Sequence, residues 1–193
     1  AKTKIPMIIS TGMSKISEIV SAVEIVKNEK CQLALLHCNS SYPTPMEDAN
    51  LSTIPYLQNM FDIPIGYSDH TDGIDACVAA VVLGASILEK HFTLDKEMEG
   101  PDQKLSSDPK EFLELVTKVR LIEKSLGKPR CGVTKSEQKF VKKMRKSVGV
   151  CVDIPANTKI TKSMLTAFRP GNGIPSSMME QLIGLKPKKA IAK

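Results

Sequence analysis

Two of the three histidines in the chain, His70 and His91, lie in short motifs of similar character, "YSDHTD" and "EKHFTLD". Each follows a short apolar run and has acidic neighbours. Two imidazoles with nearby oxygen donors suit a first-row divalent metal ion that keeps positions open for a substrate. A single histidine after a strand is more often a hydrogen-bonded packing residue. The spacing alone leaves both interpretations open.

The elements that carry these motifs alternate regularly. Apolar, β-branched runs predict strands, helical periodicity predicts helices between them, and Ser14 is a plausible N-cap of the first helix. The predicted strands cover 5–11, 31–39, 63–68 and 86–95. Continuously apolar strands in strand–helix units predict an α/β fold with a parallel sheet, buried on both faces. Ligands of such sheets bind beyond the carboxyl ends of the strands.

Polar residues gather where the four predicted strands end, which predicts one site at that rim. The candidates are Ser10, Ser40, Tyr42, Ser68, His70, Glu89 and His91. Serine hydroxyls with backbone N–H groups can hold an anion such as a phosphate, although each serine alone is an ordinary strand end or helix cap. Glu89 lies within a strand, where a carboxylate needs a ligand or a cationic partner.

Three further residues are candidates of less certain role in the sequence pattern. His37 fits a structural role, whereas Asp102 and Arg169 each have a functional and a structural interpretation. His37, in "LALLHCN", shares a strand face with Leu33 and Leu35, which favours a hydrogen-bonded core histidine. Asp102, in "GPDQKLSS", either binds a hydroxyl or shapes its loop. Arg169, in "FRPGNGI", lies in a stiff Gly/Pro loop that suits presentation of one side chain, or is an ordinary turn arginine.

The charge distribution divides the chain into two modules. Residues 1–127 carry 12 basic against 18 acidic side chains, whereas residues 128–193 carry 15 against 3, within an overall net charge of +6. The basic part is either a solvated face, a cationic cover for an anionic substrate, or a nucleic-acid surface. Aromatic residues make up only 4%, so no base-stacking platform is evident, and salt-dependent binding would test that last alternative.

The predicted modules are an α/β part at 1–127, a linker with a short basic helix at 128–146, and a small β-rich module at 147–193. The last module ends on a lysine-rich stretch with no closing element in the sequence pattern. No apolar run is long enough for a membrane span, and no nucleic-acid or membrane partner is expected. Five cysteines without a CxxC pair are typical of a reducing compartment, so we expect a cytoplasmic protein.

Six motifs together resemble the sialic acid synthase family, which includes the N-acetylneuraminate synthases and their legionaminate and pseudaminate relatives. They are "STGMS", "HCNSSYPTP", "IGYSDHT", "LEKHFTLD" followed by "GPDQKLS", and "RPGNGI". The resemblance implies the C-terminal half of a (β/α)8 TIM barrel followed by an antifreeze-like SAF domain of the β-clip type, here truncated. It also implies a domain-swapped homodimer.

The resemblance further implies a reaction. Family members condense phosphoenolpyruvate with N-acetylmannosamine or a related 2-acetamido sugar, giving a nonulosonic acid and phosphate. A divalent metal, Mn²⁺ or alternatively Mg²⁺ or Co²⁺, binds the sugar aldehyde oxygen, and the matching ligands are His70 and His91. Glu89 beside them would orient or deprotonate a group at the metal.

The same resemblance assigns the substrate contacts. Ser10, Ser68 and Tyr42 would lie at phosphoenolpyruvate, and Asp102 would contact a sugar hydroxyl. Arg169 would reach from one subunit's SAF domain into the partner's barrel. Position 40 is Ser where some members have Asn, which leaves the contact of Ser40 open.

Four strands make half of such a barrel, so the other four are expected upstream, together with the family's N-terminal glutamate and lysines. The fragment alone is therefore expected to be inactive. The alternatives are a legionaminate or pseudaminate synthase, another phosphoenolpyruvate-dependent barrel enzyme or aldolase, and a non-catalytic carbohydrate-binding relative.

Overall fold

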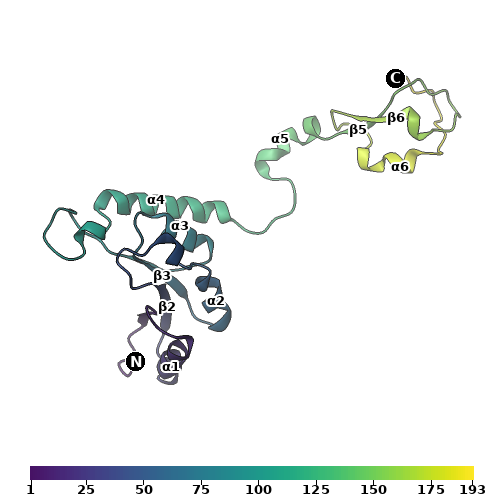
Figure 1. Cartoon of the computed structure of the whole chain (residues 1–193). Coiled ribbons are helices and arrows are strands. Elements are labelled where there is room, and N and C mark those ends of the chain that lie inside the picture. The colour runs from purple at the N-terminus through teal and green to yellow at the C-terminus, as the bar shows by residue number, and fades with distance from the viewer. The chain divides into compact units, whose positions relative to one another are not determined.

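The computed structural model describes residues 1–193, which divide into two units, Ala1–Lys128 and Pro129–Lys193 (Figure 1). The first unit contains a four-stranded sheet in the order β1-β2-β3-β4. Its strands are β1 (Met7–Ser10), β2 (Leu33–Cys38), β3 (Ile65–Asp69) and β4 (Leu88–Lys90). All neighbouring strands are parallel, which confirms the predicted α/β fold with a parallel sheet.

Four α-helices connect these strands or follow them. They are α1 (Ile16–Asn28), α2 (Thr53–Met60), α3 (Asp75–Val82) and α4 (Pro109–Leu126), with 3-10 helices η1 (Met46–Asp48) and η2 (Gln103–Leu105). Alternate strand residues such as Leu35, Ile65 and Tyr67 are buried in one cluster with Val23 of α1 and Ile54 of α2. Successive side chains of a strand point to opposite faces, so the residues between them lie on the other face. We call these the helix face and the inner face.

The sequence-based prediction of strands buried on both faces is confirmed for the central strands β2 and β3 and is wrong for the inner face of β1. Ile8 of the edge strand β1 is 58% exposed, while Met7 and Ile9 beside it pack on the helix-face core. The difference arises because helices of this chain cover only one side of β1. The fourth strand is also shorter than predicted, since β4 spans Leu88–Lys90 and only Phe92 adds an isolated bridge to Ser107.

The helix ends follow their capping residues. Asp108 caps α4, accepting the Glu111 N–H at 2.8 Å, while its own N–H donates to the Glu111 carboxylate at 3.1 Å. The predicted cap of α1 is wrong by one residue. Lys15 is the N-cap, and its N–H donates to Glu18 at 2.6 Å, because the Ser14 hydroxyl instead donates to the Gly12 carbonyl.

The second unit contains the remaining elements. They are α5 (Lys135–Met144), β5 (Ser147–Val150), η3 (Lys162–Met164), β6 (Leu165–Phe168), η4 (Ser176–Met178) and α6 (Met179–Leu182). Strands β5 and β6 are antiparallel, and Ile154, Ile160 and Leu165 form the buried centre of the unit. The expectation of an end without a closing element is wrong, because the backbone groups of Ile191 and Ile154 exchange hydrogen bonds of 2.8 and 2.9 Å.

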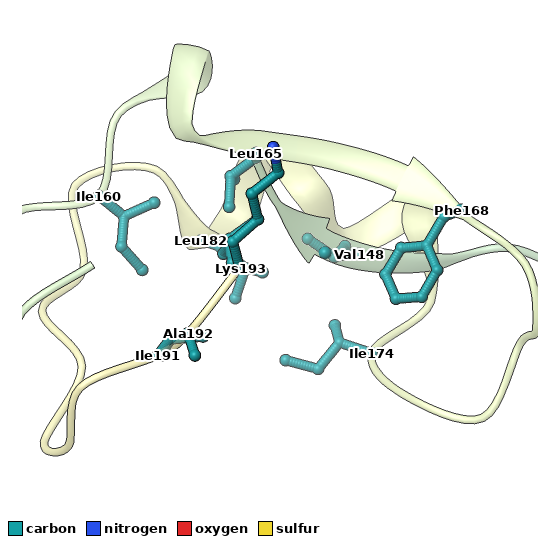
Figure 2. A pocket seen from close by; sticks show the side chains of 11 residues that line it. Val148, Ile160, Leu165, Phe168, Ile174, Leu182, Ile191, Ala192 and Lys193 are labelled. Carbon is teal, nitrogen blue, oxygen red and sulfur yellow. The ribbon is translucent and has the colours of Figure 1, made fainter. Parts of the chain in front are cut away.

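An apolar pocket of about 380 Å³ lies in the second unit (Figure 2). Val148 of β5, Leu165 and Phe168 of β6, and Ile174 line it together with the segment that ends at Lys193. The lining is otherwise apolar, and Lys193 is the one charged side chain in it. No helix of the chain combines the length and apolar character that crossing a bilayer requires.

Candidate active site

The inner face of the sheet collects the candidate residues at the carboxyl ends of the strands. The register pairs Cys38 with Ser68 and Ser68 with Glu89, so these three side chains share a face with Ser10 at the end of β1. His70 and His91 each follow the last residue of β3 and β4. Parallel strands therefore deliver these groups to one rim, as the sequence pattern predicts.

His70 and His91 converge on the hydroxyl of Tyr42. The Tyr42 oxygen lies 2.6 Å from Nε2 of His70 and 2.5 Å from Nε2 of His91. The two imidazole centroids are 5.2 Å apart, with their planes at 81°. The structure thus brings together two histidines that are 21 positions apart in sequence. Their Nε2 atoms are directed at one point, which the Tyr42 hydroxyl occupies.

The other nitrogen of each imidazole faces an oxygen. Nδ1 of His70 lies 2.6 Å from the backbone carbonyl of Asn39, and Nδ1 of His91 lies 3.6 Å from the carboxylate of Asp102. The Asn39 carbonyl can only accept, so His70 in its neutral form carries its proton on Nδ1 and presents a lone pair on Nε2. An Nδ1–H held by an oxygen is the usual arrangement of a metal-binding histidine.

Ser68 and Glu89 form a second pair beside the histidines. The Ser68 hydroxyl donates to Oε1 of Glu89 at 2.6 Å, and Ser68 is 2% exposed. The Ser68 proton is therefore committed to Glu89 in this conformation, and a substrate anion would have to replace the carboxylate as its acceptor. Glu89 itself is exposed on the inner face, where its carboxylate can reach solvent or a ligand.

Ser10 and Ser40 extend the rim towards β1. Ser10 ends β1 with an exposed side chain, and the Ser40 hydroxyl packs directly over the α-carbon of Gly12. A Cβ at residue 12 would collide with that hydroxyl, so the turn after β1 requires glycine to let the two loops approach. Ser40 also lines a polar pocket of about 420 Å³ with Asn39 and Asp48.

Arg169 belongs to the second unit. Its Nε donates to the carbonyl of Met144 at the end of α5 at 2.8 Å, and the nearby Gly171 N–H donates to the Lys142 carbonyl at 2.6 Å. These two bonds hold the "RPGNG" loop against α5 and position the exposed arginine. Of the predicted site residues, Arg169 alone lies outside the unit that carries the histidine rim.

His37 confirms the prediction of a core histidine. It is 8% exposed, its Nε2 lies 2.7 Å from the carbonyl of Ala49, and its ring stacks on Tyr67 with centroids 5.7 Å apart. Burial lowers the pKa of His37 despite the opposing effect of that hydrogen bond, so the imidazole is held neutral. This histidine lies on the helix face and takes no part in the rim.

The phenol of Tyr42 is kept protonated. Burial raises its pKa above the ordinary value, and the negative charges of Asp102, Cys38 and Glu89 raise it further. Tyr42 is therefore a neutral O–H group, whose single proton can be donated to Nε2 of one of the two imidazoles at a time. The sequence motif "SSYPTP" did not indicate this central position, since Tyr42 is 28 residues from His70 and 49 from His91.

The donor set partly fits a divalent metal ion. Two Nε2 atoms that converge within 2.6 Å of one oxygen are a suitable pair of nitrogen ligands. No group of three or more His, Cys, Asp or Glu side chains is arranged to hold a metal ion. An ion bound by His70 and His91 would therefore complete its coordination with substrate or water oxygens, which leaves it open positions.

Sequence reasoning also missed two interactions near the histidines. The Asn39 backbone carbonyl orients His70, and a backbone acceptor has no signal in the residue types. Lys90, whose side chain lies on the opposite side of β4 from Glu89, forms an ion pair with Asp69 at 2.8 Å on the helix face. The sequence did contain a signal for this ion pair, because Asp69 directly precedes His70 in "SDH" and Lys90 directly precedes His91 in "EKH".

Comparisons with known proteins agree on the family. Residues 1–130 match the NeuB family and residues 145–193 match the SAF domain. The chain is 42% identical over 187 residues to the N,N'-diacetyllegionaminic acid synthase of Campylobacter jejuni, covering 95% of this chain and 56% of that protein. It is 46% identical over 167 residues to the N-acetylneuraminate-9-phosphate synthase of Mus musculus, covering 86% and 46%.

A solved structure gives the same result. The N-acetylneuraminic acid (sialic acid) synthetase of Leptospira borgpetersenii, in complex with citrate, superposes with a TM-score of 0.66 at 45% identity, covering 70% of this chain and 48% of that one. The chain spans about half the length of the curated relatives that it matches. The resemblance stated from the motifs is confirmed.

Proposed function

The chain belongs to the NeuB family, and on that premise we propose that the protein condenses phosphoenolpyruvate with N-acetylmannosamine or a related 2-acetamido sugar. The products would be an N-acetylneuraminate-type nonulosonic acid and phosphate. The observation that carries the proposal is the convergence of the His70 and His91 Nε2 atoms on one point, with the Ser68–Glu89 pair beside them. Relatives that make sialic and legionaminic acids support the class of product.

His70 and His91 would hold the divalent ion, for which we propose Mn²⁺, with Mg²⁺ or Co²⁺ as alternatives. When bound, such an ion supplies Lewis-acid polarisation of the sugar's aldehyde oxygen. The Asn39 carbonyl keeps the proton of His70 on Nδ1 through a hydrogen bond, and the negative charge of the Asp102 carboxylate, 3.6 Å away, favours a proton on Nδ1 of His91 when Nε2 is a ligand. Both residues thereby keep the Nε2 lone pairs directed into the rim.

The reaction balances with one water. The methylene carbon of phosphoenolpyruvate forms a bond to the aldehyde carbon, whose oxygen takes up a proton. Water adds at the former enol-phosphate carbon, and phosphate leaves with cleavage of its C–O bond to give the 2-keto acid. The exposed Glu89 carboxylate is placed to orient that water or accept its proton, because its only side-chain partner is the Ser68 hydroxyl.

The remaining candidates would bind the substrates. Ser10, Ser40, Tyr42 and Ser68 offer hydroxyls to the phosphate and carboxylate of phosphoenolpyruvate, and Asp102 offers a carboxylate to a sugar hydroxyl. None of these groups carries a fixed positive charge, whereas phosphoenolpyruvate is strongly anionic. The neutralising cations must therefore come from outside this set of groups.

We propose that Arg169 supplies one such cation to the partner subunit in a domain-swapped homodimer. A mixture of His91→Gln and Arg169→Ala proteins tests this arrangement, because each swapped heterodimer would contain one site with both native residues. With random pairing we expect about a quarter of wild-type activity to return. An arginine that served its own chain's site would give no recovery above that of the separate variants.

The decisive measurement is phosphate release from phosphoenolpyruvate by the full-length gene product, with Mn²⁺ and with chelator. N-acetylmannosamine and its 2,4-diacetamido-6-deoxy analogue, run side by side, separate a sialic acid synthase from the legionaminate or pseudaminate alternatives. His70→Gln should lower release at least about 100-fold, because one of two nitrogen ligands is lost. His37→Gln is the matched control, since His37 lies on the helix face and should retain activity.

Release with neither sugar from a folded, Mn²⁺-loaded dimer would contradict the proposal. The non-catalytic carbohydrate-binding alternative would then predict sugar binding without turnover.

A further inference from the structure

The buried ion pair of Asp69 and Lys90 links the two strand ends that carry the site histidines. Asp69 and Lys90 are register partners at the last positions of β3 and β4. Their side chains are 0% and 4% exposed, and Nζ lies 2.8 Å from Oδ2. His70 and His91 are the next residue after each, so the pair joins the two chains one position before the imidazoles.

Lys90 also contacts the residue on the far side of His70. Its Nζ donates to the Thr71 carbonyl at 2.9 Å, so the ammonium contacts both residues that flank His70 in sequence. Asp69 accepts the Thr71 N–H at 2.9 Å and the Cys77 thiol of α3 at 3.1 Å. The backbone of residues 69–71 is thus held at three points from the helix face, while the His70 ring projects to the inner face.

A buried ion pair is weak evidence for stability, because replacing both charges by neutral groups of similar volume is often neutral or stabilising. The position of this pair suggests another effect. Backbone alternation places Asp69 and Lys90 on the helix face and the imidazoles on the inner face, so the pair acts on the site only through the strand ends. It leaves the inner face free for ligands.

We propose that Asp69 and Lys90 are positioning residues that set the separation and direction of His70 and His91. The inference rests on the proposed function only where it concerns metal affinity, since the imidazole geometry is a property of the protein alone. Partners that act behind the ligands of a metal site typically change metal affinity 10–100-fold when removed. We expect the same here, although neither residue reaches the rim.

The test compares the full-length wild type with the double variant Asp69→Asn/Lys90→Met, which removes both charges and leaves no buried ion unpaired. The first measurement is the imidazole ¹H–¹⁵N NMR spectrum without metal, with His70 and His91 assigned from single His→Gln variants. We expect the signals of His70 and His91 to move and those of His37, bound to Ala49, to remain. The second is the Kd for Mn²⁺ by EPR, which should weaken about 10–100-fold.

The control is Glu114→Gln/Lys118→Met on α4, an exposed pair of 2.7 Å that should change neither measurement. Should the double variant not fold, Asp69→Asn/Lys90→Gln also removes both charges but keeps amide groups that can hydrogen-bond in their place, with smaller changes of the same kind expected. A folded variant with wild-type imidazole spectra and unchanged Kd would overturn the inference. A wild type that binds no Mn²⁺ would contradict the proposed function, and the NMR comparison would still decide the inference.

Discussion

Tyr42 stacks on His70 with ring centroids 4.0 Å apart, and its hydroxyl lies 2.6 Å from Nε2 of the same imidazole. The phenol therefore takes the position that a metal ion shared by His70 and His91 would require. A metal ion bound by both imidazoles would have to displace this hydroxyl from Nε2 of each ring.

The first prediction follows from that competition. Tyr42→Phe keeps the stacked ring and removes the hydroxyl, so Mn²⁺ no longer has to displace a hydrogen bond worth about 0.5–1.5 kcal/mol. We expect the Kd for Mn²⁺ to fall about 2–10-fold, measured by EPR or calorimetry. Tyr56→Phe on the exposed surface of α2 is the control. Weaker binding in Tyr42→Phe would instead identify the hydroxyl as a contributor to the metal site.

The second prediction concerns the Ser68–Glu89 hydrogen bond of 2.6 Å. A double-mutant cycle of Ser68→Ala and Glu89→Gln should give a coupling energy of about 1.5–3 kcal/mol in kcat, because the acceptor is charged. Glu89→Gln should lower kcat more than it changes the KM for phosphoenolpyruvate, since Glu89 is proposed to act on water. Additive effects of the two substitutions would mean that the pair does not act as a unit.

The third prediction is a pH dependence of stability at His37. The folded-state pKa of this histidine lies below its unfolded value near 6.5, so the unfolded chain binds the extra proton. Stability is then fully present above about pH 6.5 and falls as the pH decreases towards the folded pKa, by up to about 1.4 kcal/mol per pH unit. Urea denaturation between pH 7 and 5 should show this slope in wild type.

His37→Gln should lack that component, because the amide can still donate to the Ala49 carbonyl but does not titrate. Equal slopes in the two proteins would assign the acid sensitivity to other groups.

The fourth prediction tests the N-cap of α4. Asp108→Ala removes the acceptor of the Glu111 N–H and should lower the free energy of unfolding by about 0.5–2 kcal/mol. Thr134→Ala, the equivalent cap of α5 in the second unit, should destabilise that unit and leave the unfolding of the first unchanged. Thermal unfolding followed by calorimetry separates the two effects, and an unchanged first transition in Asp108→Ala would contradict the prediction.

Sequence patterns predicted the elements of the first unit because their causes are local. Apolar runs at 5–11, 31–39 and 63–68 contain β1, β2 and β3, and α4 begins where an N-cap aspartate, Asp108, is followed by Pro109. Strand alternation also predicted that His37 belongs to the core and that the polar strand ends share one rim. Where the prediction was wrong, at the inner face of β1, burial depends on what covers a strand, and a residue pattern does not report that.

The chemistry of the rim depends on contacts between distant segments. Only the fold brings the Tyr42 hydroxyl between two imidazoles 28 and 49 residues away, joins Asp69 to Lys90 across 21 residues, and aligns the Asn39 carbonyl with His70. The sequence by itself determined which residue types stand at the strand ends, through period-two alternation. The tertiary structure decided which of them touch, because distances of 2.5–3 Å depend on strand register and loop closure rather than on local preference.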